Sequence, residues 1–357
     1  MEEDNRYDQN TMDMALDQLT EDTIRHIIQF LPTKSAFAMS FLFKQFEGAW
    51  SFHPVIDLDE CNPHFNNYDA FEDRNFTNIL TRYLKFREND PRPLDKFRLR
   101  MEMNQIREEI LENWLSFLAK RSIKDLDLSL RTAPSTIAKG CNYCLPSTLL
   151  SQMKSIVSLS LDYVSLKADG TMGSIHLPSL KTMSLKNMSF LDWLVLSELL
   201  RGCSSIENLS ITSCSRHALQ NSDVGLEVSN SSLKTLDIRD CNPNHVDVLQ
   251  SKNLEYFTLA SNYRGLLRAT LFEAKNLKYI NIRAQFLSRI VLFQCNVRMK
   301  ATIDTPNLQH FEFNGLKSYN VHKVIHGGLL QKRLSEAMVE GLRTDILAFC
   351  CVARNSD

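Results

Sequence analysis

The sequence lacks a long uninterrupted apolar run, which excludes a membrane-spanning helix. Its most apolar stretch, Phe190–Leu200, is interrupted by Asp192 and Glu198 and is far shorter than the ~20 residues that such a helix requires. The N-terminus also lacks a basic region followed by an apolar core, so we expect no secretory signal and a cytoplasmic or nuclear location. In that reducing environment the nine cysteines are expected to be buried thiols rather than disulfides.

The sequence also lacks a large net charge, although the two signs are unevenly distributed along it. The chain carries 41 Lys and Arg against 42 Asp and Glu. Residues 1–60 hold 4 basic and 12 acidic side chains, which leaves an excess of basic residues in the remainder. Because this excess is spread without dense Lys/Arg runs, it does not predict binding to nucleic acid.

Motifs that carry catalysis or bind metal are also missing. The sequence contains no P-loop, no G-x-G-x-x-G and no G-x-S-x-G, so we expect no catalytic residue and no cofactor. Cys141 and Cys144 have C-x-x-C spacing, but no second pair supplies the two further ligands of a zinc site. His322 and His326 lack the glutamate of H-E-x-x-H and are expected to be polar residues on a terminal helix, so no metal is expected.

What the sequence does contain is a repeated apolar pattern, L-x-x-L-x-L. Nine copies occur, at Leu94/Phe97/Leu99, Ile123/Leu126/Leu128, Ile156/Leu159/Leu161, Leu180/Met183/Leu185, Ile206/Leu209/Ile211, Leu233/Leu236/Ile238, Leu254/Phe257/Leu259, Leu277/Ile280/Ile282 and Leu308/Phe311/Phe313. Successive copies begin 21 to 33 residues apart. These spacings bracket the ~20–29 residue period of leucine-rich repeats.

The alternating part of each copy predicts a short strand with one buried face, and the strands are expected to stack in parallel. Helices are predicted between some strands, at residues 106–121 and 190–200. The apolar stripe of the first consists of Ile106, Ile110, Trp114, Phe117 and Leu118. Each repeat buries its apolar edge only against its neighbours, so we expect one solenoid. Cys214, Cys241 and Asn262 are expected to satisfy turning backbone groups.

The N-terminal part predicts a separate helical module. The apolar stripe of its first helix consists of Ile24, Ile27, Ile28 and Leu31. Thr20 is the expected N-cap and Pro32 the expected stop, and a third short helix would carry Phe46 and Trp50. Three short helices in about 35 residues cannot bury a self-sufficient core. We therefore expect another protein to complete the apolar surface of this module.

Two resemblances make the interpretation more specific. The segments "SSLKTLDIRDC" and "AKNLKYINI" are similar to the leucine-rich repeats of plant F-box proteins, from about residue 55 onward. This resemblance implies an α/β fold whose parallel β-sheet lies on the concave face of a solenoid. The run "HIIQFLPTK", with the residues that follow it to Trp50, resembles the F-box. The second resemblance implies docking onto a Skp-type linker protein, and through it onto cullin and RING subunits.

By this resemblance the docking surface consists of Leu19, Ile24, Ile27, Ile28, Leu31, Pro32, Phe41, Leu42 and Trp50. The match departs from the family at several positions. The family has Leu-Pro where this chain has Leu19-Thr20, serine where it has Phe43, and Lys-Arg-Trp where it has Lys44-Gln45-Phe46. The departures keep a second interpretation open, a leucine-rich-repeat scaffold with a degenerate F-box.

The resemblance implies a non-catalytic substrate-recognition adaptor of an SCF-type E3 ubiquitin ligase. Its unknown protein substrate is expected to bind the concave face. Tyrosine and arginine supply most binding hot spots, and the candidates on that face are Arg239, Tyr256, Tyr279, Arg283 and His310. A third interpretation, a small-molecule hormone co-receptor, requires a dense basic floor, where the pattern offers only Lys186, Arg239 and Arg283.

The predicted domains follow from these patterns. Residues 1–15 are expected to be a disordered acidic N-terminus, and residues 16–55 the F-box-like helical module. Residues 56–328 are expected to be the solenoid, and residues 329–357 a capping helix and tail. The apolar stripe of that last helix consists of Leu330, Leu334, Met338 and Leu342.

Overall fold

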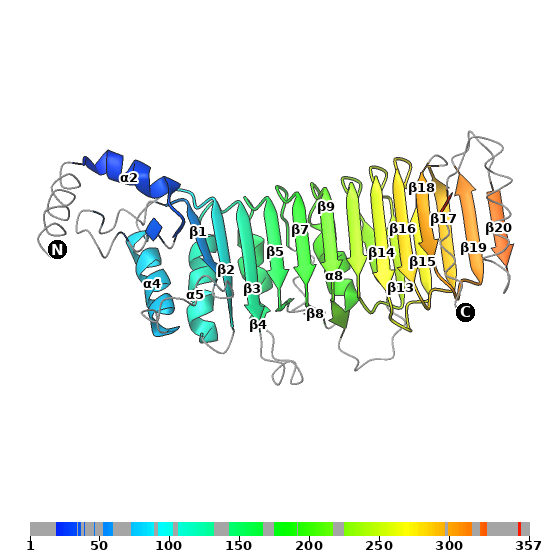
Figure 1. Cartoon of the computed structure of the whole chain (residues 1–357), viewed down its shortest axis with the longest axis horizontal. Coiled ribbons are helices and arrows are strands. Elements are labelled where there is room, and N and C mark those ends of the chain that lie inside the picture. The colour runs from blue at the N-terminus through cyan, green and yellow to red at the C-terminus, as the bar shows by residue number, and fades with distance from the viewer. Residues whose placement is uncertain are drawn as a thin grey trace, which may run out of the picture. The chain divides into compact units, whose positions relative to one another are not determined.

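Helix α2 (Glu21–Phe30) lies where the sequence predicts the first helix (Figure 1). In the computed structural model, the side-chain oxygen of Thr20 accepts a hydrogen bond from the backbone N–H of Thr23 and caps the helix. The helix ends at its C-cap, Leu31, which has extended backbone angles. This conformation is the one expected for a residue that precedes a proline, here Pro32. The predicted N-cap of the helix at Thr20 and its predicted end before Pro32 are confirmed.

The structure describes residues 19–33, 35–36, 39, 46, 53–59, 73–88, 92–102, 106–131, 143–166, 175–190, 192–216, 225–296, 299–315, 322–326 and 349–350. Contacts divide the chain into two units, Met1–Asp127 and Leu128–Asp357. The expected disordered N-terminus (1–15) lies outside the described residues. So does the expected capping helix (329–357), except for Phe349–Cys350, which form the short strand β21 instead.

The first unit contains a strand that the repeat pattern missed. Strand β1 (Val55–Asp59) pairs in parallel with β2 (Lys96–Glu102). The buried side chains Ile56 and Leu58 occupy the last two positions of the L-x-x-L-x-L pattern, but a buried His53 occupies the first. Because a histidine stands at the first position, the apolar pattern does not reveal this copy in the sequence. The first unit ends in strand β3 (Asp125–Arg131), which continues into the second unit.

Two helices belong to the same unit, α4 (Asp73–Phe86) and α5 (Glu108–Ala119). Helix α5 confirms the helix predicted at residues 106–121. Its buried face consists of Leu111, Trp114, Leu115, Leu118 and Ala119. The predicted stripe was therefore wrong in part, because Ile110 and Phe117 are only half-buried.

The second unit contains a parallel sheet, here called the main sheet, which confirms most of the predicted repeats. Its strands lie side by side in sequence order (Figure 1): β5 (Ser158–Asp162), β7 (Thr182–Lys186), β9 (Asn208–Thr212), β12 (Thr235–Arg239), β14 (Tyr256–Ser261), β16 (Tyr279–Ala284) and β18 (Lys300–Asp304). In each strand the apolar residues of the pattern point into the interior and are buried. The fold is an α/β solenoid of stacked parallel coils, as the sequence predicts.

A second sheet in this unit was not predicted. It contains the parallel strands β11 (Leu226–Ser229), β13 (His245–Leu249), β15 (Arg268–Phe272), β17 (Arg289–Cys295) and β19 (His310–Gly315), with β20 (His322–His326) antiparallel at its edge. The coils here are short, because the pattern recurs after only 21 and 23 residues at Leu254 and Leu277. Over the described residues 225–296, these coils carry a second strand and no helix. The longer coils before them carry α7 (Ser147–Gln152) and α8 (Trp193–Arg201).

Two predictions fail at the C-terminal end of the described residues. The ninth copy of the pattern, Leu308/Phe311/Phe313, belongs to β19 in the second sheet and not to the main sheet. The main-sheet strand of that coil is β18, whose interior residues are Ala301 and Ile303. In addition, His322 and His326 lie at the two ends of strand β20, whereas the sequence predicted a helix.

Tight turns follow the strands, and their backbone bonds join neighbouring coils. Among the described residues other than glycine, seven at or near strand ends have positive φ: Tyr163, Asn187, Ser213, Asp240, Gln250, Glu273 and Gln294. The N–H of Ser213 donates to the carbonyl of Arg239 at 2.9 Å. The next residue in this turn, Cys214, places its thiol 3.5 Å from the carbonyl oxygen of Leu185. Recurrent turns of this kind keep the coils in register.

The cysteines at these turns satisfy backbone carbonyls, as predicted for Cys214 and Cys241. The prediction for Asn262 was wrong by one residue. Ser261 is the buried residue, and its hydroxyl donates to the carbonyl of Cys241 at 3.0 Å. A hydrogen bond with Cys241 and burial raise the pKa of the Cys214 thiol, and burial raises that of Cys295 to about 12. These thiols stay protonated and structural.

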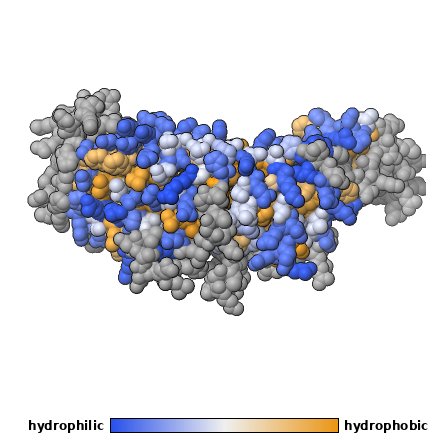
Figure 2. All heavy atoms as spheres, turned by 180° about the vertical axis from the view of Figure 1, so that it is seen from behind, coloured by the Kyte–Doolittle hydropathy of each residue, from blue (hydrophilic) through white to orange (hydrophobic). Residues whose placement is uncertain are grey.

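On the surface, hydrophobic residues form separate groups among hydrophilic ones when the molecule is seen from behind (Figure 2). Among the described helices, none is long and apolar enough to cross a membrane.

Candidate functional site

The apolar stripe predicted on α2 divides into a buried and an exposed part. Ile24 and Ile28 are 3% and 0% exposed, so the chain itself covers them. Ile27 is half-buried. Phe30 is 76% exposed, and its ring meets the ring of His26 edge-on at 4.9 Å. Ile24 and Ile28 are thus already covered in the free chain, and the exposed part of the helix centres on Phe30. The docking role of Ile24 and Ile28 stays a prediction.

The other predicted docking residues differ in their exposure to solvent. Leu19 and Leu31 are half-buried and Pro32 is exposed. Phe41, Leu42 and Trp50 lie outside the described residues. Phe30 was not among the predicted docking residues, because it falls outside the i, i+3, i+4, i+7 stripe that begins at Ile24. The signal that could have found it is a large apolar side chain on the polar side of an amphipathic helix.

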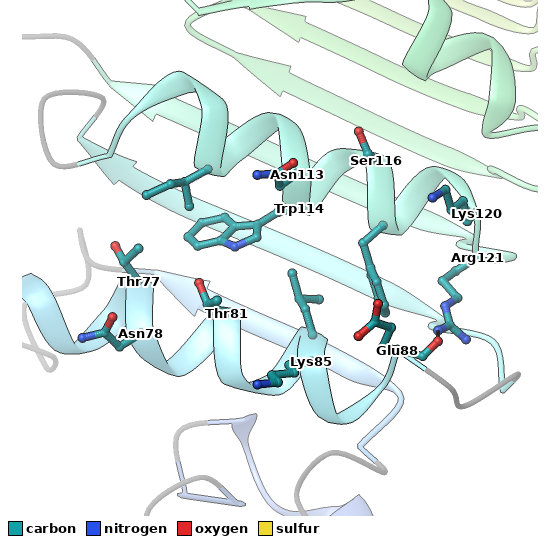
Figure 3. Close-up of a pocket in the computed structure, with 13 residues that line it drawn as sticks. Thr77, Asn78, Thr81, Lys85, Glu88, Asn113, Trp114, Ser116, Lys120 and Arg121 are labelled. Atoms are coloured by element: carbon teal, nitrogen blue, oxygen red, sulfur yellow. Dashed lines mark hydrogen bonds between the residues drawn. The ribbon is translucent and has the colours of Figure 1, made fainter.

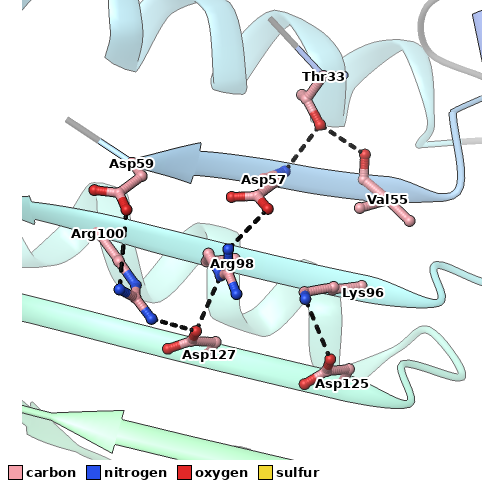
Figure 4. A network of polar contacts seen from close by, with 9 residues as sticks. All are labelled: Thr33, Val55, Asp57, Asp59, Lys96, Arg98, Arg100, Asp125 and Asp127. Carbon is pink, nitrogen blue, oxygen red and sulfur yellow. Dashed lines mark hydrogen bonds and ion pairs between the residues drawn. The ribbon is translucent and has the colours of Figure 1, made fainter. Parts of the chain in front are cut away.

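A polar network fixes the end of α2 to the first coil. The hydroxyl of Thr33 donates to the carbonyl of Val55 at 3.1 Å and accepts from the N–H of Asp57 at 3.0 Å (Figure 4). The Nε2 of His53 donates to the carbonyl of Leu31 at 2.8 Å. These bonds span 22 to 24 residues of sequence. They attach the helical module to β1 within the first unit.

Helix α4 joins the same network from its C-terminal end. The hydroxyl of Tyr83 donates to the carbonyl of His53 at 2.8 Å. The buried guanidinium of Arg87 donates to the same carbonyl and, at 2.8 Å, to that of Arg92. A buried arginine is stable only when its donors are satisfied. Hydrogen bonds to β1 and to α4 thus fix the position of the module within the first unit.

A groove lies between α4 and α5 in this unit (Figure 3), with a volume of about 940 Å³. Leu84, Ile110, Trp114 and Phe117 supply apolar side chains. The guanidinium carbon of Arg121 lies 4.6 Å from the centre of the Phe117 ring. The groove is a concave surface that sequence analysis did not predict, because its residues come from two helices far apart in the sequence.

The exposed face of the first unit's strands carries paired charges (Figure 4). Arg98 contacts Asp57 and Asp127 at 3.0 Å each, and Arg100 contacts Asp127 at 3.0 Å. Lys96 contacts Asp125 at 3.6 Å. Each of these three cations has a carboxylate partner on a neighbouring strand, so this face offers little uncompensated charge to a ligand.

The exposed face of the main sheet consists of three rows of side chains, which strand register defines. The first row is Ser158, Thr182, Asn208, Thr235, Tyr256, Tyr279 and Lys300. The middle row is Ser160, Ser184, Ser210, Asp237, Thr258, Asn281 and Thr302. The third row is Asp162, Lys186, Thr212, Arg239, Ala260, Arg283 and Asp304. Small hydroxyl side chains dominate the middle row, whereas the large side chains of the face stand in the two outer rows.

The five residues predicted to bind substrate do not form one cluster. Tyr256 and Tyr279 are neighbours in the first row, whereas Arg239 and Arg283 belong to the third row. The two rows are four residues apart along each strand, or ~13 Å. His310 begins β19 in the second sheet, where it lies 3.5 Å from Glu312. The predicted position of His310 beside the tyrosines is therefore wrong, because β19 belongs to the second sheet.

The two tyrosines form an exposed stack. Their ring centres are 5.4 Å apart and their planes differ by 8°. Tyr256 is 42% exposed and Tyr279 is 44% exposed. The Nζ of Lys300 lies 5.7 Å from the centre of the Tyr279 ring, a cation–π contact. Lys300 was not predicted to lie beside the tyrosines, because the apolar pattern does not reveal strand β18.

The two arginines of the third row have different environments. The Nε of Arg239 contacts both carboxylate oxygens of Asp237, at 2.8 and 3.0 Å, and this hydrogen bond raises the pKa of Arg239. Arg283 is exposed and lies between Ala260 and Asp304 in register. Among the described residues, no carboxylate comes within ion-pair distance of Arg283. Its charge is available to a ligand.

A row of alternating charges precedes the strands of the main sheet at one edge, here called the edge ladder. Its members are Lys181, Glu207, Lys234, Glu255 and Lys278. Lys234 contacts Glu207 at 2.7 Å, and Lys278 contacts Glu255 at 2.7 Å. The hydrogen bond from Lys234 lowers the pKa of Glu207. The edge ladder stabilises neighbouring coils against each other and is largely neutral.

Comparison with known families finds two separate matches in the chain. The F-box domain model matches residues 16–55. A second model, described as "FBD-associated F-box protein At5g56370, LRR repeats", matches residues 111–271. The first match contains α2, and the second contains strands of both sheets.

Several curated proteins of Arabidopsis thaliana are similar to this chain. F-box/LRR-repeat protein At4g14103 is 29% identical over 266 residues, which are 73% of this chain and 66% of the relative. F-box/FBD/LRR-repeat protein At1g78750 is 23% identical over 299 residues, 81% of this chain and 57% of the relative. FBD-associated F-box protein At5g44490 is 28% identical over 199 residues, 55% of this chain and 38% of the relative. The matches span between about a third and two thirds of these relatives.

Proposed function

Because the chain is a plant F-box/leucine-rich-repeat protein, we propose that it is a substrate-recognition adaptor of an SCF-type E3 ubiquitin ligase. Its F-box docks onto a Skp-type linker, which connects it to cullin and RING subunits. Its repeats bind the protein that is to be ubiquitylated. The match of residues 16–55 to the F-box model carries this proposal.

The exposed part of α2 supports the docking role. Phe30 presents a large apolar side chain to solvent, beside the half-buried Ile27 and the exposed Pro32. Burial of such a ring in an interface stabilises a complex by up to ~3 kcal/mol. The network around Thr33 and His53 holds this surface in place before a partner binds, which lowers the entropic cost of association.

The exposed face of the main sheet supports the substrate-binding role. Tyr256, Tyr279 and Arg283 are exposed there and are of the residue types that dominate binding hot spots. The adaptor needs no catalytic residue of its own. It raises the effective concentration of a bound protein near a charged ubiquitin carrier, and other subunits supply the chemistry. The cytoplasm and nucleus are the proposed locations.

Association of the purified full chain with a purified Skp-type linker tests the proposal. A pull-down at micromolar concentrations is expected to recover a complex, and addition of cullin and RING subunits is expected to recover all of them. No association of the chain with the linker at these concentrations would overturn the adaptor function.

The burial of Ile24 and Ile28 favours a second candidate function, a leucine-rich-repeat scaffold that no longer engages the linker. In that case the chain itself completes most of the apolar surface of the module, and the repeats bind a protein without delivering it for ubiquitylation. The same pull-down separates the two, since a scaffold captures its partner protein but not the linker.

A further inference from the structure

The two stacked tyrosine rings on the main sheet are covered by a further side chain at one end of the stack and uncovered at the other end, here called the open end. Register orders the first row here as Thr235, Tyr256, Tyr279 and Lys300 on four adjacent strands. Lys300 covers the outer face of the Tyr279 ring. At the opposite end Tyr256 is followed by Thr235, whose side chain is too small to cover an aromatic ring. One face of Tyr256 is therefore open.

The spacing of the strands fits one more ring at the open end. Adjacent strands lie ~4.8 Å apart, and stacked rings prefer centre separations of ~4.5–7 Å. The separation of Tyr256 and Tyr279, 5.4 Å, falls in this range. A ring placed above Thr235 would therefore meet Tyr256 at the same spacing. Beyond Thr235 the first row continues with the short side chain of Asn208, which leaves room for the incoming group.

The charges around the open end favour an aromatic ring over a cation as the group that stacks on Tyr256. They also favour acidic over basic residues next to that ring in the bound partner. The exposed rows of β12, β14, β16 and β18 carry Arg239, Arg283 and Lys300 against Asp237 and Asp304. Asp237 is already occupied by Arg239, while the charge of Arg283 is available. The carboxylates near the open end already have cationic partners: Asp237 pairs with Arg239, Glu207 with Lys234 and Glu255 with Lys278. An incoming cation therefore finds no unpaired carboxylate there among the described residues. A carboxylate, in contrast, finds a partner in Arg283.

We propose that the main sheet binds an acidic extended segment of a partner protein, whose aromatic side chain stacks on Tyr256 above Thr235 and whose carboxylate pairs with Arg283. Arg283 lies two strands and four residues away from Thr235, a diagonal of ~16 Å. An extended segment spans this distance in about five residues. The proposal rests on the proposed function, because the partner is the protein that the adaptor recruits.

A fluorescence-anisotropy titration of the full chain tests the proposal. The probe is a labelled peptide of about twelve residues with one Trp, a Glu five positions further on, and Asp, Ser and Gly elsewhere. Two control peptides replace the Trp by Ala or the Glu by Lys. Wild-type chain is expected to bind the probe ~10-fold more tightly than either control peptide.

Matched variants locate the binding site. Thr235→Tyr fills the space beside Tyr256 and is expected to weaken binding of the probe ~10-fold. Thr182→Tyr adds the same side chain to the same row two strands away, and is expected to leave affinity within about twofold. Tyr256→Ala removes the stacking surface and is expected to weaken binding as Thr235→Tyr does. Thermal unfolding of each variant verifies that it is folded.

Three outcomes would overturn the inference: no binding of the probe by wild-type chain, equal binding of all three peptides, or unchanged affinity in the folded Thr235→Tyr variant. Association with the linker reports on the proposed function separately. Linker binding without peptide binding rejects this substrate class alone. If the chain binds the peptide but not the linker, the adaptor function is rejected, whereas the proposed binding surface on the main sheet is retained.

Discussion

At the scale of single residues, exposure separates the side chains that hold the module together from those that are available to a partner. Ile28 and Phe30 are two positions apart on α2, yet the first is 0% and the second 76% exposed. An aromatic ring in water at the end of a helix has no role in the core of its own chain. Substitution of these two residues is therefore expected to have opposite consequences.

Phe30→Ala is expected to lower the affinity for the Skp-type linker ~10-fold or more, because it removes apolar area from the proposed interface. Its thermal unfolding midpoint is expected to remain that of the wild type. Isothermal titration with the linker measures the first effect, and a melt followed by circular dichroism measures the second.

Phe86→Ala is the matched control. Phe86 is the last residue of α4 as Phe30 is of α2, and it is 46% exposed. Its removal should not change linker affinity. Ile28→Ala, in contrast, is expected to cost ~2–5 kcal/mol of unfolding free energy in urea. Equal linker affinity of the wild type and Phe30→Ala would mean that α2 does not form the interface.

At the scale of helices and strands, the predictions held where one element carries its own periodic signal. The strands around Leu236 and Ile280 and helix α8 have such signals and are confirmed. Strand β1 was missed because His53 replaces the leading leucine. The second sheet was missed because its strands, except β19, lie outside the nine assigned copies of the L-x-x-L-x-L pattern.

The binding surface was harder to predict than the elements. Which side chains are neighbours depends on the register between strands, and one misassigned strand, β19, moved His310 onto the wrong sheet. The same error hid Lys300, which completes the tyrosine stack. Residue types pointed to Tyr256 and Tyr279, but their separation from Arg239 and Arg283 by ~13 Å follows only from the paired strands.

The edge ladder gives the solenoid a pH-dependent contribution to stability. The pKa of Glu207 is lowered from its ordinary value of 4.5 by the hydrogen bond from Lys234. A carboxyl whose pKa is lower in the folded chain stabilises the fold above its unfolded pKa, and this contribution is lost as the pH falls through the folded pKa. We expect Glu207→Gln to melt slightly below the wild type at pH 7.

This difference in melting temperature is expected to shrink below about pH 4.5 and in high salt, which screens exposed pairs. Differential scanning calorimetry at pH 7 and at pH 3.5, with and without 1 M sodium chloride, measures it. A difference that persists unchanged at the acidic pH would show that the substitution acts through packing and not through charge.

At the scale of the whole molecule, the F-box module and the first repeats share one unit. The unit extends to Asp127, far beyond the module boundary expected near residue 55. Bonds from His53 to Leu31 and from Tyr83 to His53 explain this, because residues on both sides of the expected boundary complete one polar network. The module relies on its own chain for most of its support.

A fragment of residues 1–55 is therefore expected not to fold alone, since it lacks the donors of Tyr83 and Arg87 and all of β1 except its first residue. Its circular dichroism melt is expected to be broad and non-cooperative. The full chain is expected to show a cooperative transition. A sharp, cooperative melt of the fragment would contradict the shared unit.

The central claim is that one chain carries two separate binding surfaces, the exposed side of α2 for the linker and the main sheet for the recruited protein. Hydrogen exchange of the full chain with and without saturating Skp-type linker tests it most directly. The account predicts slower exchange at Glu21–Phe30 and unchanged exchange at Tyr256–Ser261 and Tyr279–Ala284. Unchanged exchange in α2, or linker-induced protection of those two strands, would contradict it.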